Sequence, residues 1–206
     1  MILENRLAAV MGGKMAVGGL RAGAEPFIEQ LAAPTPTPGG GSAAAAAGAM
    51  AAALGSMVAG LSRGKKAYLQ HERQLSQVIS RLAQLREELK SGIDADAESY
   101  NQVIAAHRQA KASSDGEGLV DAATRAATQV PLETAQKARE VAQLIGSLRP
   151  ITNPIMASDL TVAVALAEAA VTGALANVEI NLESLKDAGF VADVRSKVVE
   201  LQRQIP

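Results

Sequence analysis

An aspartate on an otherwise apolar helical stripe is the residue with the clearest potential for chemistry. The stripe has the three- and four-residue spacing of helices packed in a bundle. It runs through Leu75, Val78, Leu82, Leu85 and Leu89, and then through Ile93, Asp96, Tyr100, Val103 and His107. At about 100° per residue, Asp94 and Glu98 point away from this stripe. Asp96 is therefore predicted to lie on a buried face, with Tyr100 one turn later.

Asp96 has two interpretations. A carboxylate on a buried face is costly unless it is paired or protonated, and a protonated carboxyl suits general acid–base catalysis near neutral pH. In the structural interpretation, Asp96 pairs with a buried arginine or caps a helix that is broken at Gly92. Its position on the stripe leaves both interpretations open.

A glycine triplet opens the alanine-rich segment of the chain. Gly39, Gly40 and Gly41 precede Ser42, which is expected to cap the following helix. Backbone N–H groups of successive glycines, together with a helix N-terminus, can bind an anion or a polar heterocycle. The spacing is not that of a P-loop, because no Lys-Ser or Lys-Thr pair follows the glycines. The triplet alone favours a tight turn that lets two helices touch.

Two further groups of polar residues flank long apolar segments. Lys65 and Lys66, with Arg63 nearby, could bind the carboxylates of a ligand or stabilise a helix C-terminus. Asp159 begins a later helix, on which Asn177 and Asn181 lie one turn apart. Buried amides need partners, so they could bind a pterin-like edge or bond across a subunit interface. Asp159 and Asn181 are about six turns apart, so one compact site holds both only if two subunits contribute.

Composition indicates an all-α fold and excludes several classes of function. Aromatic residues make up 2% of the 206 residues, and Ala, Leu, Gln, Glu and Arg are plentiful, which favours helix over strand. The formal net charge of -1 provides no basic field for nucleic acid or an anionic membrane. Cysteine is absent, and the only two histidines, His71 and His107, are far apart in the sequence. A histidine-rich metal site is therefore not expected. His107 is kept out of the catalytic set.

The pattern of elements predicts a single antiparallel bundle of five to six main helices that dimerises through helix packing. Residues 1–24 form an arm of uncertain structure, and residues 25–206 form one helical domain. A break or kink is expected near Val130, because Pro131 follows it, and Gly92 could kink or break the earlier helix, although the apolar stripe resumes beyond it. The alanine-rich helix should present a face of large apolar residues, Met50, Leu54, Met57, Val58 and Leu61, and a second face of small ones. It is expected to be a buried helix and not a membrane span.

Motifs in this order resemble the formimidoyltetrahydrofolate cyclodeaminase and methenyltetrahydrofolate cyclohydrolase family. The opening signature is PTPGGGSAAAAAGAMAAALGSMV, residues 36–58, followed by Gly64-Lys-Lys-Ala-Tyr68. The later motifs are Asp94-Ala-Asp-Ala-Glu-Ser-Tyr100, Val130-Pro-Leu132, Ser158-Asp-Leu160 and Asn177-Val-Glu-Ile-Asn-Leu182. The loop Arg149 to Pro154 departs from the family pattern, which leaves substrate choice open.

The resemblance implies a cytoplasmic, dimer-forming helical enzyme that acts on a tetrahydrofolate derivative and needs no metal or other cofactor. It implies that Asp96 is the catalytic residue. It implies that folate is bound by Gly39, Gly40, Gly41, Ser42, Lys65, Lys66, Tyr100, Asp159, Asn177 and Asn181. The sequence leans slightly towards a cyclodeaminase of histidine degradation, with a formimidoyltransferase as partner. The alternatives are a methenyltetrahydrofolate cyclohydrolase and, more remotely, a non-catalytic helical scaffold.

Overall fold

The computed structural model describes residues 19–112 and 115–203, and it divides into two compact units at Thr37 and Pro38. In the first unit, helix α2 (Gly19–Ala32) confirms the short helix expected over residues 24–31 and extends it towards the N-terminus. The remainder of the predicted arm, residues 1–18, lies outside the described residues. The domain boundary at residue 24 stays a prediction.

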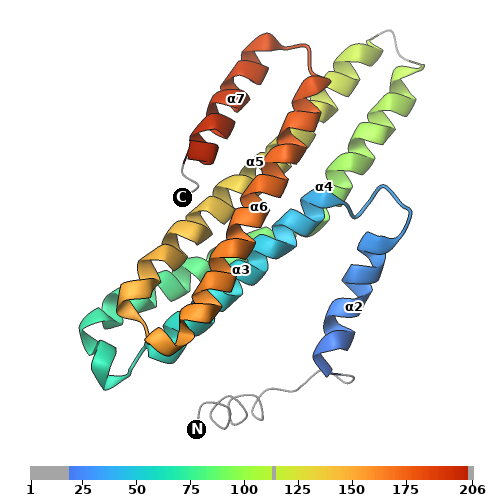
Figure 1. Ribbon diagram of the computed structural model, residues 1–206. Coiled ribbons are helices and arrows are strands. Elements are labelled where there is room, and N and C mark those ends of the chain that lie inside the picture. The colour runs from blue at the N-terminus through green and yellow to red at the C-terminus, as the bar shows by residue number, and fades with distance from the viewer. Residues whose placement is uncertain (1–18, 113–114, 204–206) are drawn as a thin grey trace. The chain divides into compact units, whose positions relative to one another are not determined.

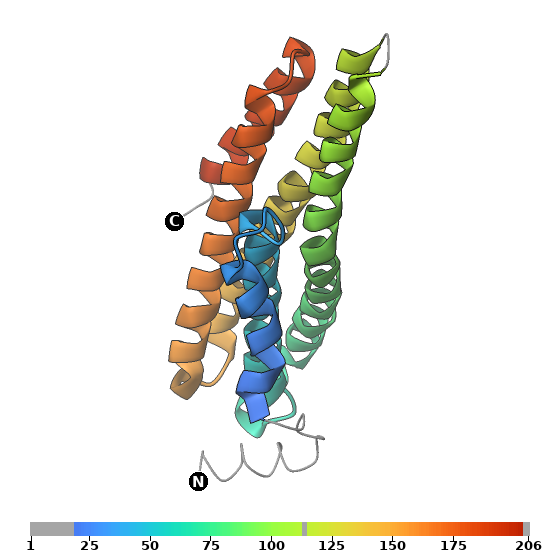
Figure 2. The ribbon, with the colours of Figure 1, turned by 90° about the vertical axis from the view of Figure 1, so that its right-hand side faces the viewer.

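The second unit is built on four long helices, as Figures 1 and 2 show. They are α3 (Gly40–Ser62), α4 (Glu72–Ala110), α5 (Gly116–Leu148) and α6 (Ala157–Glu183). Helix α3 packs against each of the other three, and α7 (Ala188–Arg203) lies against α5 and α6. Short 3₁₀ turns connect them at Lys66–His71, Arg149–Ile151 and Pro154–Met156. Every regular element in the described ranges is a helix, which confirms the predicted all-α bundle.

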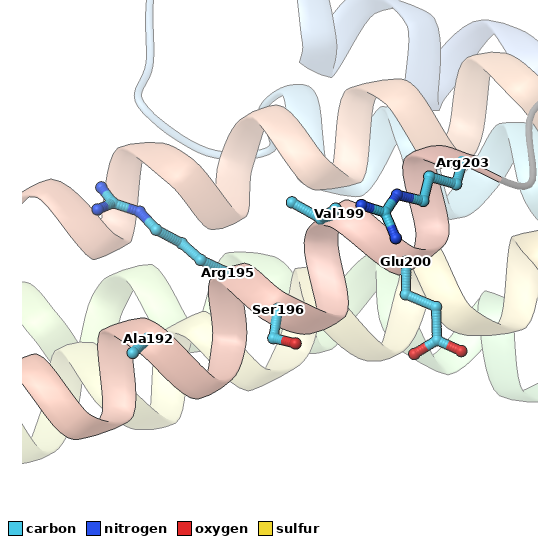
Figure 3. Close-up of a pocket in the computed structure, with 6 residues that line it drawn as sticks. All are labelled: Ala192, Arg195, Ser196, Val199, Glu200 and Arg203. Carbon is cyan, nitrogen blue, oxygen red and sulfur yellow. The ribbon is translucent and has the colours of Figure 1, made fainter.

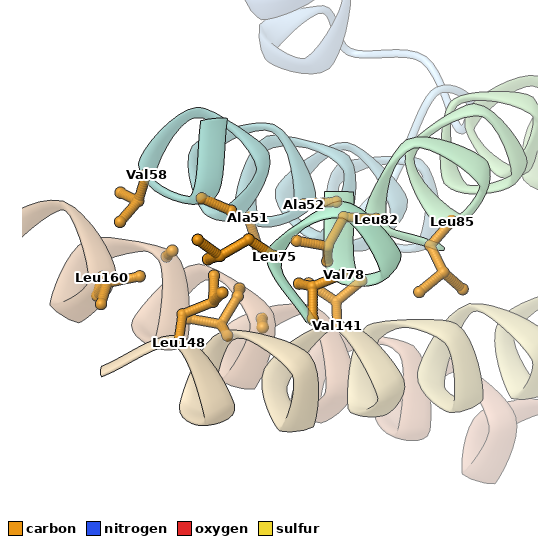
Figure 4. Packing of buried hydrophobic residues seen from close by; sticks show 14 of the residues in the cluster. Ala51, Ala52, Val58, Leu75, Val78, Leu82, Leu85, Val141, Leu148 and Leu160 are labelled. Atoms are coloured by element: carbon orange, nitrogen blue, oxygen red, sulfur yellow. The ribbon is translucent and has the colours of Figure 1, made fainter. Parts of the chain in front are cut away.

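The predicted stripe on α4 forms one side of the main core. Its five residues from Leu75 to Leu89 are all buried. Figure 4 shows the first four of them with Val58 of α3, Val141 and Leu148 of α5 and Leu160 of α6. The expected break at Gly92 is absent, because α4 continues to Ala110. Beyond Gly92 the stripe becomes more open: Asp96 is half-buried and Tyr100 is 39% exposed.

The small face predicted for α3 is the face that packs closely against the other helices. Gly41, Gly48, Gly55 and most alanines of α3 are buried, together with Val58, whereas Met50 is 53% exposed and Leu61 is 44% exposed. A β-carbon at Gly55 would lie 2.9 Å from Ile145 Cγ1. Close approach by α4, α5 and α6 leaves room mainly for small side chains on the face of α3 that they cover.

Of the break or kink expected near Val130, the break is absent, because α5 continues through Pro131. Proline lacks the N–H group that would bond the carbonyl of Ala127, four residues earlier. Asn181 of α6 supplies the missing donor, with its Nδ2 3.2 Å from the Ala127 oxygen. A side chain from a neighbouring helix thus satisfies the carbonyl that Pro131 leaves unpaired, and α5 runs unbroken from Gly116 to Leu148.

Two helices of the bundle, α3 and the segment Pro154–Glu183, are long and apolar enough to cross a membrane by length and composition. Half of the most apolar window of α3 and a third of that of the second segment are buried inside the bundle. The core position of α3 accounts for its composition without a bilayer.

Candidate functional site

The carboxyl group of Asp96 binds the N-terminal turn of α3. The backbone N–H of Ser42 donates to Asp96 Oδ2 at 2.8 Å, and the Ser42 hydroxyl lies 2.9 Å from the same oxygen. That hydroxyl is also 2.9 Å from the carbonyl oxygen of Ile93. Asp96 therefore caps a helix from the side, which is what the first-turn N–H groups of a helix require.

Ser42 is not the N-cap that the sequence predicted. Helix α3 begins two residues earlier, with Gly39 in the capping position and no side-chain hydrogen bond there. Ser42 falls in the first turn, and its side chain is fully buried. It contacts Asp96 and cannot contact a ligand directly, so its predicted role in binding folate does not fit its position.

Gly41 makes room for the carboxyl group. A β-carbon at this position would overlap Asp96 Oδ1, and it would lie 2.5 Å from Asp96 Cγ and 2.9 Å from Oδ2. No side chain fits between the turn and the carboxyl group, which is a specific reason for glycine at residue 41. Gly40 and Gly41 belong to the first turn of α3 and not to a separate tight turn, but Gly41 does let a second helix, the one that carries Asp96, approach closely.

Asn177 brings α6 to the same turn. Its Nδ2 atom lies 3.4 Å from where a β-carbon of Gly40 would be, and it donates to the Gly173 carbonyl oxygen at 2.8 Å. We call Gly40, Gly41, Ser42, Asp96 and Asn177 the glycine-turn cluster. It joins three helices and combines a carboxylate, a carboxamide and a helix N-terminus, a set of groups able to exchange a proton and to bind a polar ring.

Tyr100 and Asn181 lie one turn further along their helices. Tyr100 follows Asp96 on α4, and at 39% exposure its ring lies at the surface and not on the buried face that the stripe predicted. Asn181 follows Asn177 on α6, and one of its two amide hydrogens is donated to the Ala127 carbonyl oxygen. Asn181 thus has a structural role that the sequence did not reveal, because Pro131 and Asn181 are far apart in the chain, and its part in folate binding stays a prediction.

The remaining predicted binding residues lie at the other end of α3. Ser62, at the C-terminus of α3, accepts a hydrogen bond from the Asn153 N–H at 3.2 Å, which ties this end of α3 to the loop before α6. Lys65 and Lys66 follow α3 and are exposed, and Asp159 lies in the first turn of α6. At 1.5 Å per residue, Gly40 and Ser62 are about 33 Å apart. A single chain therefore does not bring Lys65, Lys66 and Asp159 to the glycine-turn cluster.

Two surface hollows lie outside the glycine-turn cluster. One, of about 500 Å³, follows the surface of α7 (Figure 3) and is lined by Ala192, Arg195, Ser196, Val199, Glu200 and Arg203. The other, of about 780 Å³, lies where α4 ends and α5 begins, and its lining includes His107. Neither contains a residue predicted to bind or transform the substrate. Among the described residues no group of three His, Cys, Asp or Glu side chains could hold a metal ion.

Comparison with known proteins places this arrangement in a family. Residues 23–200 match the model of the formiminotransferase-cyclodeaminase family. The chain belongs to that family. It is 38% identical over 180 residues to a methenyltetrahydrofolate cyclohydrolase of Methylorubrum extorquens, covering 85% of this chain and 86% of that protein. It is 31% identical over 179 residues to the formimidoyltransferase-cyclodeaminase of Gallus gallus, covering 85% of this chain and 33% of that protein.

A solved member of the family has the same fold. The crystal structure of formiminotetrahydrofolate cyclodeaminase from Thermotoga maritima is 30% identical in sequence, with a TM-score of 0.81 and 88% of each chain covered. The expected resemblance is confirmed, and the protein is an enzyme of folate one-carbon metabolism.

Proposed function

We propose that the protein is a 5,10-methenyltetrahydrofolate cyclohydrolase, which adds water to its substrate and gives 10-formyltetrahydrofolate. The observation that carries this proposal is the 38% identity to a relative with that name, along 86% of its length. The bifunctional cyclodeaminases are about 31% identical and are matched over about a third of their length. The comparisons thus favour the alternative over the cyclodeaminase towards which the sequence leaned.

In this proposal the reacting carbon lies beside the glycine-turn cluster, and Asp96 moves the proton. The carboxylate takes a proton from the water that attacks the methenyl carbon. It then gives that proton to N5 as the bond between N5 and the carbon breaks, and the hydroxyl of the adduct loses its own proton to solvent as the formyl C=O forms. One carboxyl group serves as base and then as acid, and such catalysis contributes on the order of 10²–10⁴-fold. The folate derivative is the substrate, and the proposed steps use no metal or other cofactor.

The second candidate is a formimidoyltetrahydrofolate cyclodeaminase, supported by the Thermotoga maritima structure, which matches 88% of each chain. N10 would attack the formimidoyl carbon, and Asp96 would protonate the departing ammonia. A formimidoyltransferase is the expected partner in that case, since the bifunctional relatives carry both names.

Absorbance of 5,10-methenyltetrahydrofolate separates these candidates. With methenyltetrahydrofolate as substrate we expect an enzyme-dependent loss of absorbance. A gain of absorbance and release of ammonia from 5-formimidoyltetrahydrofolate would identify a cyclodeaminase. No change with either substrate, and no folate retained, would favour a non-catalytic scaffold. Asp96→Asn should lower turnover by about 10²–10⁴-fold while folate binding is kept, and unchanged turnover would contradict the role of Asp96.

We also propose that the protein acts as a homodimer in the cytoplasm. Helix α3 presents a charge-free stripe of partly or fully exposed residues, namely Ala43, Ala46, Ala47, Met50, Ala53, Leu54, Met57, Gly60 and Leu61. The exposed side of α6 includes Val162, Ala165, Ala169, Thr172, Ala176 and Ile180. Contiguous apolar surface of this kind is typical of protein interfaces. A second copy could then supply the folate-binding Lys65 and Lys66, and a monomer at micromolar concentration by analytical ultracentrifugation would refute this assembly.

A further inference from the structure

The two oxygens of the Asp96 carboxyl group have unequal surroundings. Oδ2 accepts the backbone N–H of Ser42 at 2.8 Å and lies 2.9 Å from the Ser42 hydroxyl, which shares its single hydrogen between Oδ2 and the Ile93 carbonyl oxygen. Oδ1 has no hydrogen bond to any residue in the described ranges and lies against the α-carbon of Gly41. The protein therefore holds the carboxyl group by one oxygen and leaves the other available.

The contacts of Ser42 position Asp96 Oδ2. Its side chain is fully buried, so it is out of reach of a ligand in solvent. Its hydroxyl sits between Asp96 Oδ2 and the carbonyl oxygen of Ile93, 2.9 Å from each, so both groups that it touches belong to α4. Because the backbone N–H and the hydroxyl come from the same residue, rotation of the carboxyl group would break both bonds together.

We propose that Ser42 is a positioning residue that reserves Oδ2 for hydrogen bonds within the protein and makes Oδ1 the oxygen that carries the transferable proton. A proton on Oδ2 would compete with the backbone N–H of Ser42, which is directed at that oxygen, and with the shared hydrogen of the Ser42 hydroxyl, whereas a proton on Oδ1 meets no donor among the described residues. The proton taken from the attacking water thus forms an O–H bond at Oδ1. The same bond breaks when the proton passes to N5, and Ser42 keeps its own hydrogens throughout.

This inference rests on the proposed function, because it assumes that Asp96 transfers a proton. It adds that catalysis depends on a side chain that never touches the folate. Loss of the Ser42 hydroxyl should therefore lower kcat and leave KM unchanged. A residue that binds folate would instead change KM.

The test compares Ser42→Ala and Ser42→Cys with a matched control, Ser62→Ala. Cysteine keeps most of the side-chain volume but is a weak donor, so that variant should fold even if the alanine variant does not. Ser62 is also a fully buried serine of α3, but it lies at the opposite end and bonds the Val58 carbonyl oxygen. Folding of each variant is checked by far-ultraviolet circular dichroism and thermal unfolding.

We expect kcat for methenyltetrahydrofolate to fall on the order of 10- to 100-fold in both Ser42 variants, as for other small displacements of a catalytic group. Their KM and the kcat of Ser62→Ala should stay at wild-type values. Wild-type kcat in a folded Ser42→Cys protein, or a rise in KM that accounts for the whole loss, would overturn the inference. Asp96→Asn separates the two proposals. Full turnover in Asp96→Asn would refute the catalytic role of Asp96. Loss of turnover in Asp96→Asn together with wild-type turnover in the Ser42 variants would refute only the positioning role of Ser42.

Discussion

Gly41→Ala is the most direct test of the geometry around Asp96. The new methyl group would overlap Asp96 Oδ1 and lie 2.5 Å from Cγ, so the carboxyl group and the turn cannot both keep their positions. Asp96 is the more mobile of the two, because its side chain can rotate whereas the turn is fixed by the helix that follows. We expect the carboxyl group to swing away from Ser42.

The cost follows from the bonds that are lost. Both hydrogen bonds from Ser42 to Oδ2 would break, and each bond to a charged group contributes about 1.5–3 kcal/mol. Asp96 is only half-buried, so water would restore part of this loss. Gly41→Ala should therefore lower the free energy of unfolding by about 2–4 kcal/mol, which corresponds to a fall in Tm of roughly 4–16 °C for a chain of this size. Turnover should fall on the order of 100-fold, because the catalytic carboxyl group is displaced.

Thermal unfolding and steady-state kinetics would measure both effects, with Gly146→Ala as the matched control. Gly146 lies inside α5, and a β-carbon there meets no atom within 4 Å. Alanine is the better helix former, so this control should raise stability by up to about 1 kcal/mol and leave turnover unchanged. Wild-type Tm and turnover in Gly41→Ala would refute the contact between the turn and Asp96.

Two further predictions concern the bundle. Asn181→Ala should lower the free energy of unfolding, measured in urea, by about 1–3 kcal/mol, because it leaves the Ala127 carbonyl unpaired. The loss should be smaller in a Pro131→Ala background, where residue 131 regains its N–H donor. Equal losses in both backgrounds would contradict this account. The hydrogen bond from Arg81 keeps the pKa of Glu140 below its ordinary value. The pair therefore stabilises the fold above about pH 4.5, and this stabilisation is lost as the pH falls through the folded pKa of Glu140. Unfolding measured from pH 7 to pH 3 should show that wild type and Arg81→Gln converge at the acidic end; a constant difference would argue against the pair.

The sequence predicted the helices and their buried face well because the information is local. The spacing of Leu75, Val78, Leu82 and Leu85 already defines a helical stripe, and the structure buries it. Asp96 stood out for the same reason. The spacing could not identify the hydrogen-bond partner of Asp96, because Ser42 is 54 residues away and the bond exists only after α3 and α4 pack.

The errors share a physical cause. Pro131 and Gly92 were expected to break helices because local propensity disfavours both, but packing and the side chain of Asn181 overrode that tendency. The sequence indicated a face of large apolar residues and a face of small residues on α3, but local spacing could not show how the other helices would cover each face. In this bundle the available space was small, so glycine and alanine took the buried side and Met50 was left at the surface.

The packing of α3 against α4, α5 and α6 ties formation of the site to folding of the whole unit. The glycines of α3 weaken it as an isolated helix, and the carboxyl group that accepts the N–H of Ser42 belongs to α4. Exchange of that amide hydrogen with solvent deuterium would then require opening of the interface between α3 and α4. Its protection factor would report how often the contact between Ser42 and Asp96, the proposed proton-transfer residue, opens under native conditions.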